Sequence, residues 1–434
     1  MTLAHSSRAS SIRYAVLSAL CFITIVNYIQ RNSIGGMLGP ITSELNTSDE
    51  AIGLSGTAFF LAYALMQIPT GLLAQRWGAR RALPLYAAGW SLATAGMGMA
   101  ADVWGFIGCR GVMGALQAGI FPAATLVMAA WLPSSQRAFA SALLNSCMLI
   151  GGAIVNNLTA EAMLPKGPLT WRELLAVYAA PGILWAVWFA WWFRNTPEEH
   201  PSVNEAEKKV IAAGRSGQSP NVRAAISWTV LLSVTLWLIC AQQFLRAGGS
   251  RFMDQWLARY LELVPLRTET DDTIRQATAK HYSTIPQYAG VVGGLVGGFL
   301  SDAILRRTGR RWLARNGVAA GSLFLGSLTF LPVLWFTEPV AQVVFLTLGY
   351  FLVTLASPCA YAITMDVGGR NLPLIFGAMN MVGNFGAAAV TGIVPWFNQL
   401  TPETWAASLA MLIGIHAIAG ILWIVIDSRR SLEK

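Results

Sequence analysis

Four arginines lie deep inside long apolar stretches of this sequence, away from the ends of those stretches, where a permanent positive charge must have a partner or a function. They are Arg31, Arg110, Arg246 and Arg251. A guanidinium stays charged at any accessible pH, so an arginine at membrane depth must face protein, water or a ligand instead of lipid. If Arg31 merely reached out of the membrane from a helix end, only about 17 residues of its apolar stretch would precede it, the short limit for crossing a bilayer. We therefore interpret Arg31 as a functional residue.

Arg31 and Arg246 are the pair that could bind a small dianion. Two guanidinium forks can close on two carboxylates or on phosphate oxygens, and this bidentate geometry favours arginine over lysine. The apolar stretches contain no lysine. Arg110 precedes Gln117 by seven residues, so these two side chains share one face of a helix. Carboxylate and phosphate require the same arrangement of arginines, so the sequence leaves both as possible ligands.

Arg251 and Asp254 are three residues apart, near enough on a helix for an ion pair. We expect them to neutralise each other, which leaves Arg246 as the uncompensated cation of that stretch. Asp254 is the only acidic residue that we place deep in a stretch, so it is the acidic group there that could exchange a proton.

These side chains must be positioned by membrane-spanning helices. Apolar residues make up 55% of the 434 residues and charged residues 12%, with a mean hydropathy of +0.51. Long apolar runs of this kind are typical of a polytopic helical membrane protein. The net charge is +9, and the positively charged residues lie in short turns between the runs and not on one soluble face, which argues against a nucleic-acid partner. The five cysteines have no paired spacing, so we expect neither disulfides nor a metal site.

The runs and the turns between them predict an all-α membrane protein of twelve transmembrane helices in two six-helix bundles. The expected spans are residues 14–38, 51–74, 82–101, 104–131, 138–161, 174–193, 227–261, 284–304, 313–335, 339–365, 373–397 and 404–426. A polar cytoplasmic linker, 194–226, separates an N-terminal bundle, 1–193, from a C-terminal bundle, 227–434. The distribution of Lys and Arg predicts that both termini are cytoplasmic, in a multi-pass protein of the cell (inner) membrane.

Two matching glycine and arginine turns indicate that the halves are structural repeats. One follows the second span, in residues 71–81, and the other follows the eighth, in residues 298–311. Both resemble the G-x-x-x-D-R-x-G-R-R signature of the major facilitator superfamily, an alternating-access transporter fold, and this resemblance covers essentially the whole chain. It implies gating roles for Gly71, Gly78, Arg80, Arg81, Asp302, Arg306 and Arg310. The first copy has Gln75 where the superfamily usually has Asp, which weakens any charge latch on that side.

A finer resemblance lies in residues 110–122, which are similar to the R-x-x-x-G-x-x-E-A-G-x-x-P pattern of the anion:cation symporter family. That family holds sugar-acid symporters, sialin and the vesicular glutamate transporters. Residues 380–384 resemble its N-M-x-G-N motif, and Tyr28 and Arg31 match its first helix. The resemblance implies that Tyr28, Asn380 and Asn384 contact substrate.

Two departures from the family bear on energy coupling. Proton-coupled members carry acids at the positions of Gln30 and Gln117, and neither glutamine can carry a proton. Arg246 resembles an arginine that vesicular glutamate transporters use in the seventh helix. His416, in the twelfth span, is expected to be structural.

The resemblance thus implies a carrier for a small organic anion, a carboxylate or sugar acid. The replacement of the family's acids by Gln30 and Gln117 predicts uniport or exchange. The expected substrate-binding residues are Arg31, Arg246, Arg110, Tyr28, Gln30, Gln117, Asn380, Asn384 and Tyr361. Organophosphate exchange for phosphate and proton symport through Asp254, with Arg251, are the alternatives within transport, and a receptor or structural protein on a carrier fold is another class. With no catalytic set or cofactor motif in the sequence, we predict neither an enzyme nor a bound cofactor, and we expect a functional monomer.

Overall fold

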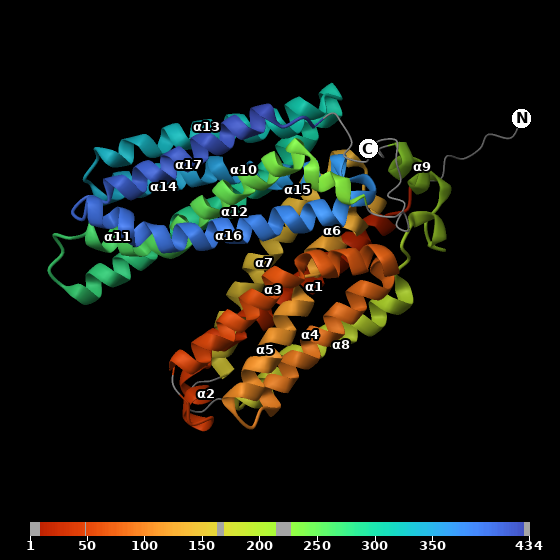
Figure 1. Ribbon diagram of the computed structural model, residues 1–434, viewed down its shortest axis with the longest axis horizontal. Helices are drawn as coiled ribbons and strands as arrows, with labels where there is room; N and C mark the ends of the chain where they lie inside the picture. Colours follow the sequence, from red (N-terminus) through yellow and green to blue (C-terminus); the bar gives the residue numbers. More distant parts are fainter. Residues whose placement is uncertain (1–8, 48, 163–168, 214–226, 429–434) are drawn as a thin grey trace, which may run out of the picture. The chain divides into compact units, whose positions relative to one another are not determined.

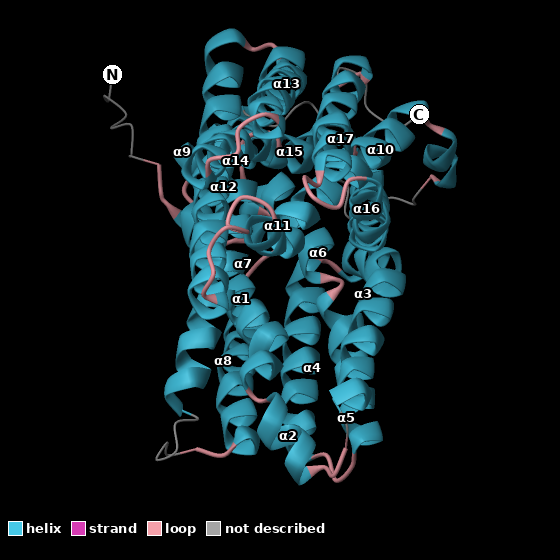
Figure 2. Cartoon of the chain, turned by 90° about the vertical axis from the view of Figure 1, so that its left-hand side faces the viewer, coloured by secondary structure: helices cyan, strands magenta, loops and turns pink. Residues whose placement is uncertain are grey.

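The computed structural model describes residues 9–47, 49–162, 169–213 and 227–428. Every regular element in these residues is helical, as Figure 2 shows, so the predicted all-α architecture is confirmed. Within them, ten helical segments are long and apolar enough to cross a membrane. The expected spans 82–101 and 227–261 are also largely helical but lie outside this set. Small residues lower the mean hydropathy of the first, and Gln and Arg lower that of the second.

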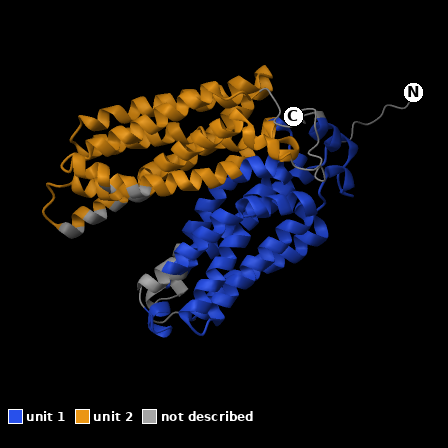
Figure 3. Ribbon diagram, in the orientation of Figure 1, with its two compact units in different colours: residues 1–134, 143–226, 372–377 blue, residues 135–142, 227–371, 378–434 orange. Residues whose placement is uncertain are grey.

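The chain divides into two compact units, which Figure 3 shows in two colours. Unit 1 comprises residues 1–134, 143–226 and 372–377. In Figure 1, α4 and α8 run along each other, and the contacts show the same for α3 and α5. The helices of unit 1 are α1 (Ile12–Asn32), α2 (Leu38–Glu44), α3 (Asp49–Trp77), α4 (Ala79–Met99), α5 (Val103–Gln117), α6 (Ile120–Trp131), α8 (Trp171–Trp192) and α9 (Glu205–Ala213), with most of α7 (Ser134–Ala162).

Unit 2 comprises residues 135–142, 227–371 and 378–434. Here α13 packs against both α14 and α17, and α12 packs against α14 (Figure 1). Its helices are α10 (Val234–Arg251), α11 (Leu257–Leu263), α12 (Asp272–Thr308), α13 (Val318–Phe330), α14 (Pro339–Thr354), α15 (Ser357–Val367), α17 (Ala406–Val425) and most of α16 (Leu372–Leu400). Two π-helical segments interrupt the α-helices, η4 (Phe252–Trp256) and η5 (Leu313–Gly317).

Helix starts follow local sequence signals. Thr170 caps α8 by accepting from the backbone N–H of Glu173, while the Glu173 carboxylate accepts from the backbone N–H of Thr170. The Asp102 carboxylate accepts from Gly105 N–H at 2.7 Å and begins α5. Such caps satisfy N–H groups that have no partner within the helix. Both caps begin helices of unit 1.

Two of the predicted spans are broken helices. The expected span 104–131 is divided into α5 and α6 at Ala118 and Gly119, and the expected span 339–365 is divided into α14 and α15 at Leu355 and Ala356. These are the fourth spans of the two halves, counted from each start. Discontinuous helices at corresponding places in two repeats are typical of transporters.

The expected linker, 194–226, is described only as far as residue 213, and its remainder lies outside the described residues. Its helix α9 packs on the start of α1 through the buried carboxylate of Glu207. That carboxylate accepts from the backbone N–H groups of Ile12 and Arg13, at 3.2 and 3.1 Å, and from the Arg13 guanidinium and the Ser10 hydroxyl. The linker thereby caps the helix that carries Arg31.

Candidate functional site

Arg31, near the end of α1, lies among aromatic rings. Its guanidinium carbon is 4.7 Å from the ring centre of Tyr63, 4.8 Å from that of Phe59, and 5.3 Å from those of Tyr28 and Phe60. Its NH1 group also lies 3.5 Å from the Tyr28 hydroxyl. Ring faces attract a cation without removing its positive charge. Arg31 is therefore held in place while it stays available to an anion.

Arg110, on α5, lies beside Arg31. Its NH2 group donates to the backbone carbonyl of Arg31 at 2.9 Å, and its guanidinium carbon lies 4.6 Å from the centre of the Phe59 ring. It is buried, and its Nε has no hydrogen-bond partner in the described residues. Among these residues neither arginine forms an ion pair. Two neighbouring cations, the half-buried Arg31 and the buried Arg110, without a carboxylate form a site that favours an anion.

A close helix contact brings these two arginines together. Gly114, one turn after Arg110, packs against the backbone of Phe59 on α3, and a Cβ atom there would lie 2.3 Å from the Phe59 carbonyl oxygen. Only glycine allows the two backbones to approach so closely. The Phe59 ring is then shared by the two guanidinium groups. Phe59, Phe60 and Tyr63 were not among the predicted site residues, although aromatic spacing in residues 59–63 is visible in the sequence.

Gln30 points away from this arginine pair. Its amide nitrogen donates to the Ser91 hydroxyl at 3.1 Å and to the Tyr178 carbonyl at 2.8 Å, and its amide oxygen accepts from the Thr94 hydroxyl at 2.9 Å. The side chain is fully buried between α1, α4 and α8. The structure therefore gives Gln30 a helix-joining environment rather than a place beside Arg31.

Gln117 is buried and donates to the backbone carbonyl of Asn27 at 3.4 Å. Its amide oxygen, the amide nitrogen of Asn27 and both amide atoms of Gln67 have no partner among the described residues. Gln67, on α3, lies at a depth similar to that of Gln117. Thr70, three residues after Gln67, contacts Gly119, two residues after Gln117. Unpaired buried donors and acceptors need a polar partner such as water or a ligand. Gln67 is thus a further polar residue of this region. Its spacing of four residues from Tyr63 marks the two as polar groups within one span, which could bind substrate or join helices.

In unit 2, Arg246 on α10 contacts only neutral groups among the described residues. Its Nε donates to Gln243 at 3.1 Å, and its NH1 donates to the Ser357 hydroxyl at 2.8 Å, just after the break between α14 and α15. Gly383 on α16 packs against the Gln243 side chain. The structure thus brings Arg246 close to the predicted motif 380–384.

Three other predicted residues of unit 2 are half-buried: Asn380, Asn384 and Tyr361. Asn384 donates to the backbone carbonyl of Asn380 at 3.0 Å, one turn back along α16. Tyr361 lies on α15, where its backbone carbonyl accepts from Thr364 at 2.7 Å. None of the described hydrogen bonds joins these side chains to Arg246.

Arg251 and Asp254 differ from the expected ion pair. Both side chains are exposed, and the described residues contain no salt bridge between them. The reason is local: Asp254 lies in the π-helical segment η4, whose wider turn shifts residues that an α-helix would align three positions apart. Asp254 still interacts electrostatically with Arg251 and with the Tyr350 hydroxyl.

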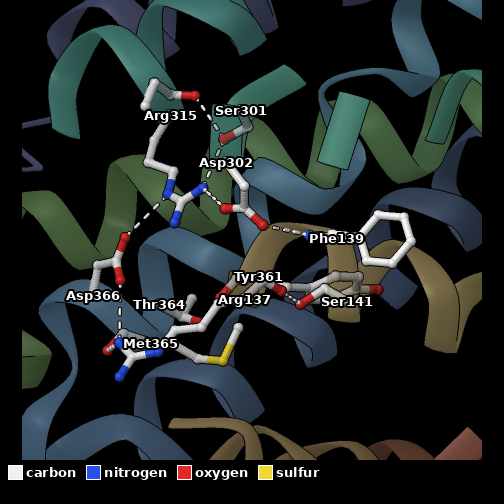
Figure 4. Close-up of polar contacts among 11 residues, drawn as sticks. Arg137, Phe139, Ser141, Ser301, Asp302, Arg315, Tyr361, Thr364, Met365 and Asp366 are labelled. Carbon is white, nitrogen blue, oxygen red and sulfur yellow. Dashed lines mark hydrogen bonds and ion pairs between the residues drawn. The ribbon is translucent and has the colours of Figure 1, made fainter. Parts of the chain in front are cut away.

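The second gating turn leads into a buried ionic cluster, drawn in Figure 4. Arg315 donates to Asp302 at 2.7 Å and to Asp366 at 3.1 Å, and Asp366 also accepts from Arg137 at 3.2 Å. The other Asp302 oxygen accepts from the backbone N–H of Phe139 at 2.9 Å, near the start of α7. The sequence patterns gave no role to Arg315 or Asp366, although both stand at the ends of apolar runs and are buried.

The remaining predicted gating residues have mostly structural contacts. Gly71 packs against Pro122, and Gly78 has a positive φ of 78°. Arg80 donates to the Ala190 carbonyl, and Arg306 donates to the Ser135 carbonyl at 2.9 Å. Arg81 and Arg310 are exposed.

The fold and these charged groups define a polytopic helical carrier built from two repeats. The sequence pattern of the Major Facilitator Superfamily matches residues 20–391, and the chain belongs to that superfamily. It is therefore a multi-pass membrane transporter rather than an enzyme, as predicted. The expected major facilitator fold is confirmed as well.

Curated relatives carry anions according to their names. A probable sulfoacetate transporter of Cupriavidus necator is 29% identical over 415 residues, covering 94% of this chain and 93% of the relative. The D-galactonate transporter of Escherichia coli O6:H1 is 25% identical, covering 93% of this chain and 94% of the relative. Among solved structures, the Escherichia coli fucose:proton symporter matches with a TM-score of 0.69 at 15% identity, covering 96% and 99% of the two chains, which shows the shared fold.

Proposed function

We propose that the chain moves a small organic anion, a carboxylate or sugar acid, across the membrane by alternating access. The observation that carries this proposal is the pair Arg31 and Arg110 in unit 1. Each guanidinium belongs to a membrane-spanning helix, the two meet at the Phe59 ring, and neither has a carboxylate partner among the described residues. An anion would neutralise charge that the protein leaves uncompensated.

Arg246 supplies the corresponding cation of unit 2. Its guanidinium is anchored on two sides by Gln243 and Ser357, so it loses little side-chain freedom when an anion arrives. Tyr28, Gln117, Asn380, Asn384 and Tyr361 are the polar groups proposed to contact the rest of the substrate. Gln30, with its amide fully bonded, acts by joining α1 to α4 and α8. The relatives named for sulfoacetate and D-galactonate support an anionic substrate.

The transport mode proposed is uniport or exchange. Gln30 and Gln117 have no titratable group, and the amide of Gln30 is held by three hydrogen bonds within unit 1. The proposed gate is the ionic cluster of Arg315, Asp302 and Asp366, which includes the second signature turn. Breaking and remaking such buried pairs is a way to make two conformations discrete. The carrier works as a monomer in the inner membrane, with both termini in the cytoplasm.

Uptake of labelled anions into proteoliposomes that contain only this protein tests the proposal. D-galactonate and sulfoacetate are expected to enter and to compete with each other, and neutral galactose is not. The control is protein with Arg31→Gln, which keeps the fold but loses the charge. No uptake of any anion by well-folded protein would favour a receptor or structural protein. Uptake of glycerol phosphate in exchange for phosphate, without uptake of carboxylates, would favour organophosphate exchange.

A further inference from the structure

A short basic turn joins two membrane spans in unit 2. The candidate spans His281–Thr308 and Leu313–Leu334 leave only residues 309–312 between them. A turn this short must lie where the bilayer meets water, at the level of the lipid headgroups. Four arginines lie in or beside it: Arg306, Arg307, Arg310 and Arg311.

The turn borders a half-open surface hollow of about 710 Å³, lined by Gly309, Arg310, Arg311, Trp312 and Leu313. Arg310 is exposed, and Arg311 and Trp312 are half-buried. Leu313 is 41% exposed and begins the next apolar run. The lining therefore combines two cationic side chains with an indole and an aliphatic side chain. Tryptophan is common at membrane interfaces, where one end of the ring is wet and the other apolar.

The charges of this turn are left without acidic partners. Among the described residues, Arg307, Arg310 and Arg311 form no salt bridge, and Arg306 donates to a backbone carbonyl. In contrast, the deeper Arg315 is matched by Asp302 and Asp366. The arginines of the turn thus keep their full charge toward the membrane surface.

The corresponding turn of unit 1 shows what the second turn lacks. There, Gly78 lies against the side chain of Asn195, whose amide oxygen accepts from the backbone N–H of Arg80 at 3.0 Å. Gly309 occupies the place of Gly78 in the second copy, with a φ of 64°, and a Cβ atom there would meet nothing within 4 Å. Arg311 corresponds to Arg80. In the first turn the acceptor comes from a distant residue, Asn195. In the second, the hydroxyl of Thr308 accepts from the backbone N–H of Arg310 at 3.2 Å, and no described side chain lies within 4 Å of the Cβ position of Gly309.

We propose that the hollow of residues 309–313 binds the phosphate group of an anionic phospholipid. Arg310 and Arg311 bind the phosphate oxygens, which take the place that the Asn195 amide oxygen has in the first turn. Trp312 and Leu313 contact the glycerol backbone and the first acyl carbons. A free phosphate would use the arginines alone, whereas Trp312 and Leu313 in the same lining fit the apolar part of a lipid. Basic pockets next to membrane spans recognise anionic headgroups by this chemistry.

The test measures by native mass spectrometry the affinity of phosphatidylglycerol for protein from which lipid has been removed. Each arginine near the surface is worth about fivefold in affinity, so Arg310→Gln with Arg311→Gln should weaken binding about thirtyfold. The matched control removes two exposed arginines from the first turn, Arg76→Gln with Arg81→Gln, and should leave this affinity within about twofold. Equal losses in both double variants would show a nonspecific charge effect and overturn the proposal.

Two further arms distinguish the source of the phosphate and do not depend on the variants. Inorganic phosphate and glycerol phosphate at millimolar concentration should fail to displace the lipid, and displacement by either would favour a free-phosphate site. A photoreactive phosphatidylglycerol added to the wild-type protein should label a peptide that contains residues 306–313. Labelling confined to other peptides would contradict the proposed site.

Discussion

At the scale of single residues, the proposed transport site consists of arginines that no acid among the described residues neutralises. Arg31 and Arg110 share the Phe59 ring, and Arg246 is held by an amide and a hydroxyl. Lysine keeps the charge of each but loses the planar fork that binds two oxygens at once. The type of side chain, and not only its charge, should therefore matter at these positions.

Arg31→Lys and Arg246→Lys should each nearly abolish anion uptake while leaving the fold intact. The loss of one charge-assisted hydrogen bond, at about 1.5 to 3 kcal/mol, corresponds to a factor of roughly 10 to 150 in affinity. The measurement is substrate affinity and uptake in proteoliposomes, with melting temperature as the check on folding. Arg259→Lys is the control, because Arg259 is exposed and pairs with Glu262. Wild-type uptake by both site variants would remove Arg31 and Arg246 from the site.

For Arg251 and Asp254, the π-helical segment changes what we expect of a double variant. Because Asp254 lies in the π-helical segment and no salt bridge joins it to Arg251 among the described residues, we expect only a weak coupling between the two side chains. Arg251→Gln and Asp254→Asn should then have effects on stability that add within about 0.5 kcal/mol in the double variant. Chemical denaturation of the single and double variants measures this sum. A coupling of about 1 kcal/mol or more would restore the ion pair that the spacing predicts.

At the scale of elements, the sequence predicted the helices well and their interruptions poorly. Long apolar runs were enough to locate the spans, because a bilayer requires about 20 apolar residues per helix. The breaks at Gly119 and Ala356 and the segment η4 depend on packing and backbone register, which a run of apolar letters does not contain. Arg315 was missed for a related reason. Its two carboxylate partners come from other helices, so only the folded chain shows that its charge is neutralised.

The docking of α9 on α1 gives a prediction at this scale. Glu207 is fully buried, accepts from two backbone N–H groups at the start of α1 and pairs with Arg13. Glu207→Gln should lower stability by about 1.5 to 3 kcal/mol, because bonds to a charged acceptor are strong and the neutral amide cannot accept them all. Glu205→Gln, two residues away, is the control, since Glu205 is exposed and pairs only with Lys208 along the helix. Its removal should leave the melting temperature unchanged, because an exposed ion pair contributes little to stability.

The melting temperatures of the two variants provide the measurement. A large drop for Glu207→Gln with no drop for Glu205→Gln would support the cap. Equal and small effects would mean that α9 contributes little to holding α1, and the position of Arg31 would then depend on contacts further along α1, such as those of Gln30 and Arg110.

At the scale of the whole molecule, the repeated signature turns made the two-part architecture predictable. The differences between the two turns could be seen only in the structure. Two signature turns at equivalent positions are enough, as sequence alone, to indicate two repeated halves. The turns are not equivalent in detail, because Asn195 fills the first, whereas none of the described residues fills the second. Gln75 replaces the acid in the first copy, whereas Asp302 is neutralised by Arg315 and accepts from the backbone N–H of Phe139 near the start of α7. We therefore expect the two turns to have different functions where their residues differ.

Energy coupling is the property of the whole carrier on which these residues bear most directly. A proton symporter needs a group whose charge changes during the cycle, and glutamine has none. Gln30 is held by three hydrogen bonds, and Gln117 is an amide, so unit 1 has no titratable replacement at the family's two acidic positions. We therefore expect anion uptake to be independent of an imposed proton gradient.

The experiment is uptake into proteoliposomes with an inward proton gradient, the membrane potential clamped and the pH on the substrate side held fixed. Uniport predicts equal uptake with and without the gradient, and exchange predicts uptake only into vesicles preloaded with anion. Asp254 is the group that could reverse the result, because it lies in the π-helical turn that follows the helix of Arg246 and interacts with Arg251 and Tyr350. Arg251→Gln is the matched control, since it alters those surroundings without removing the carboxylate. Concentrative uptake that a protonophore collapses, and that disappears in Asp254→Asn but persists in Arg251→Gln, would contradict the uncoupled mode and make Asp254 the coupling residue.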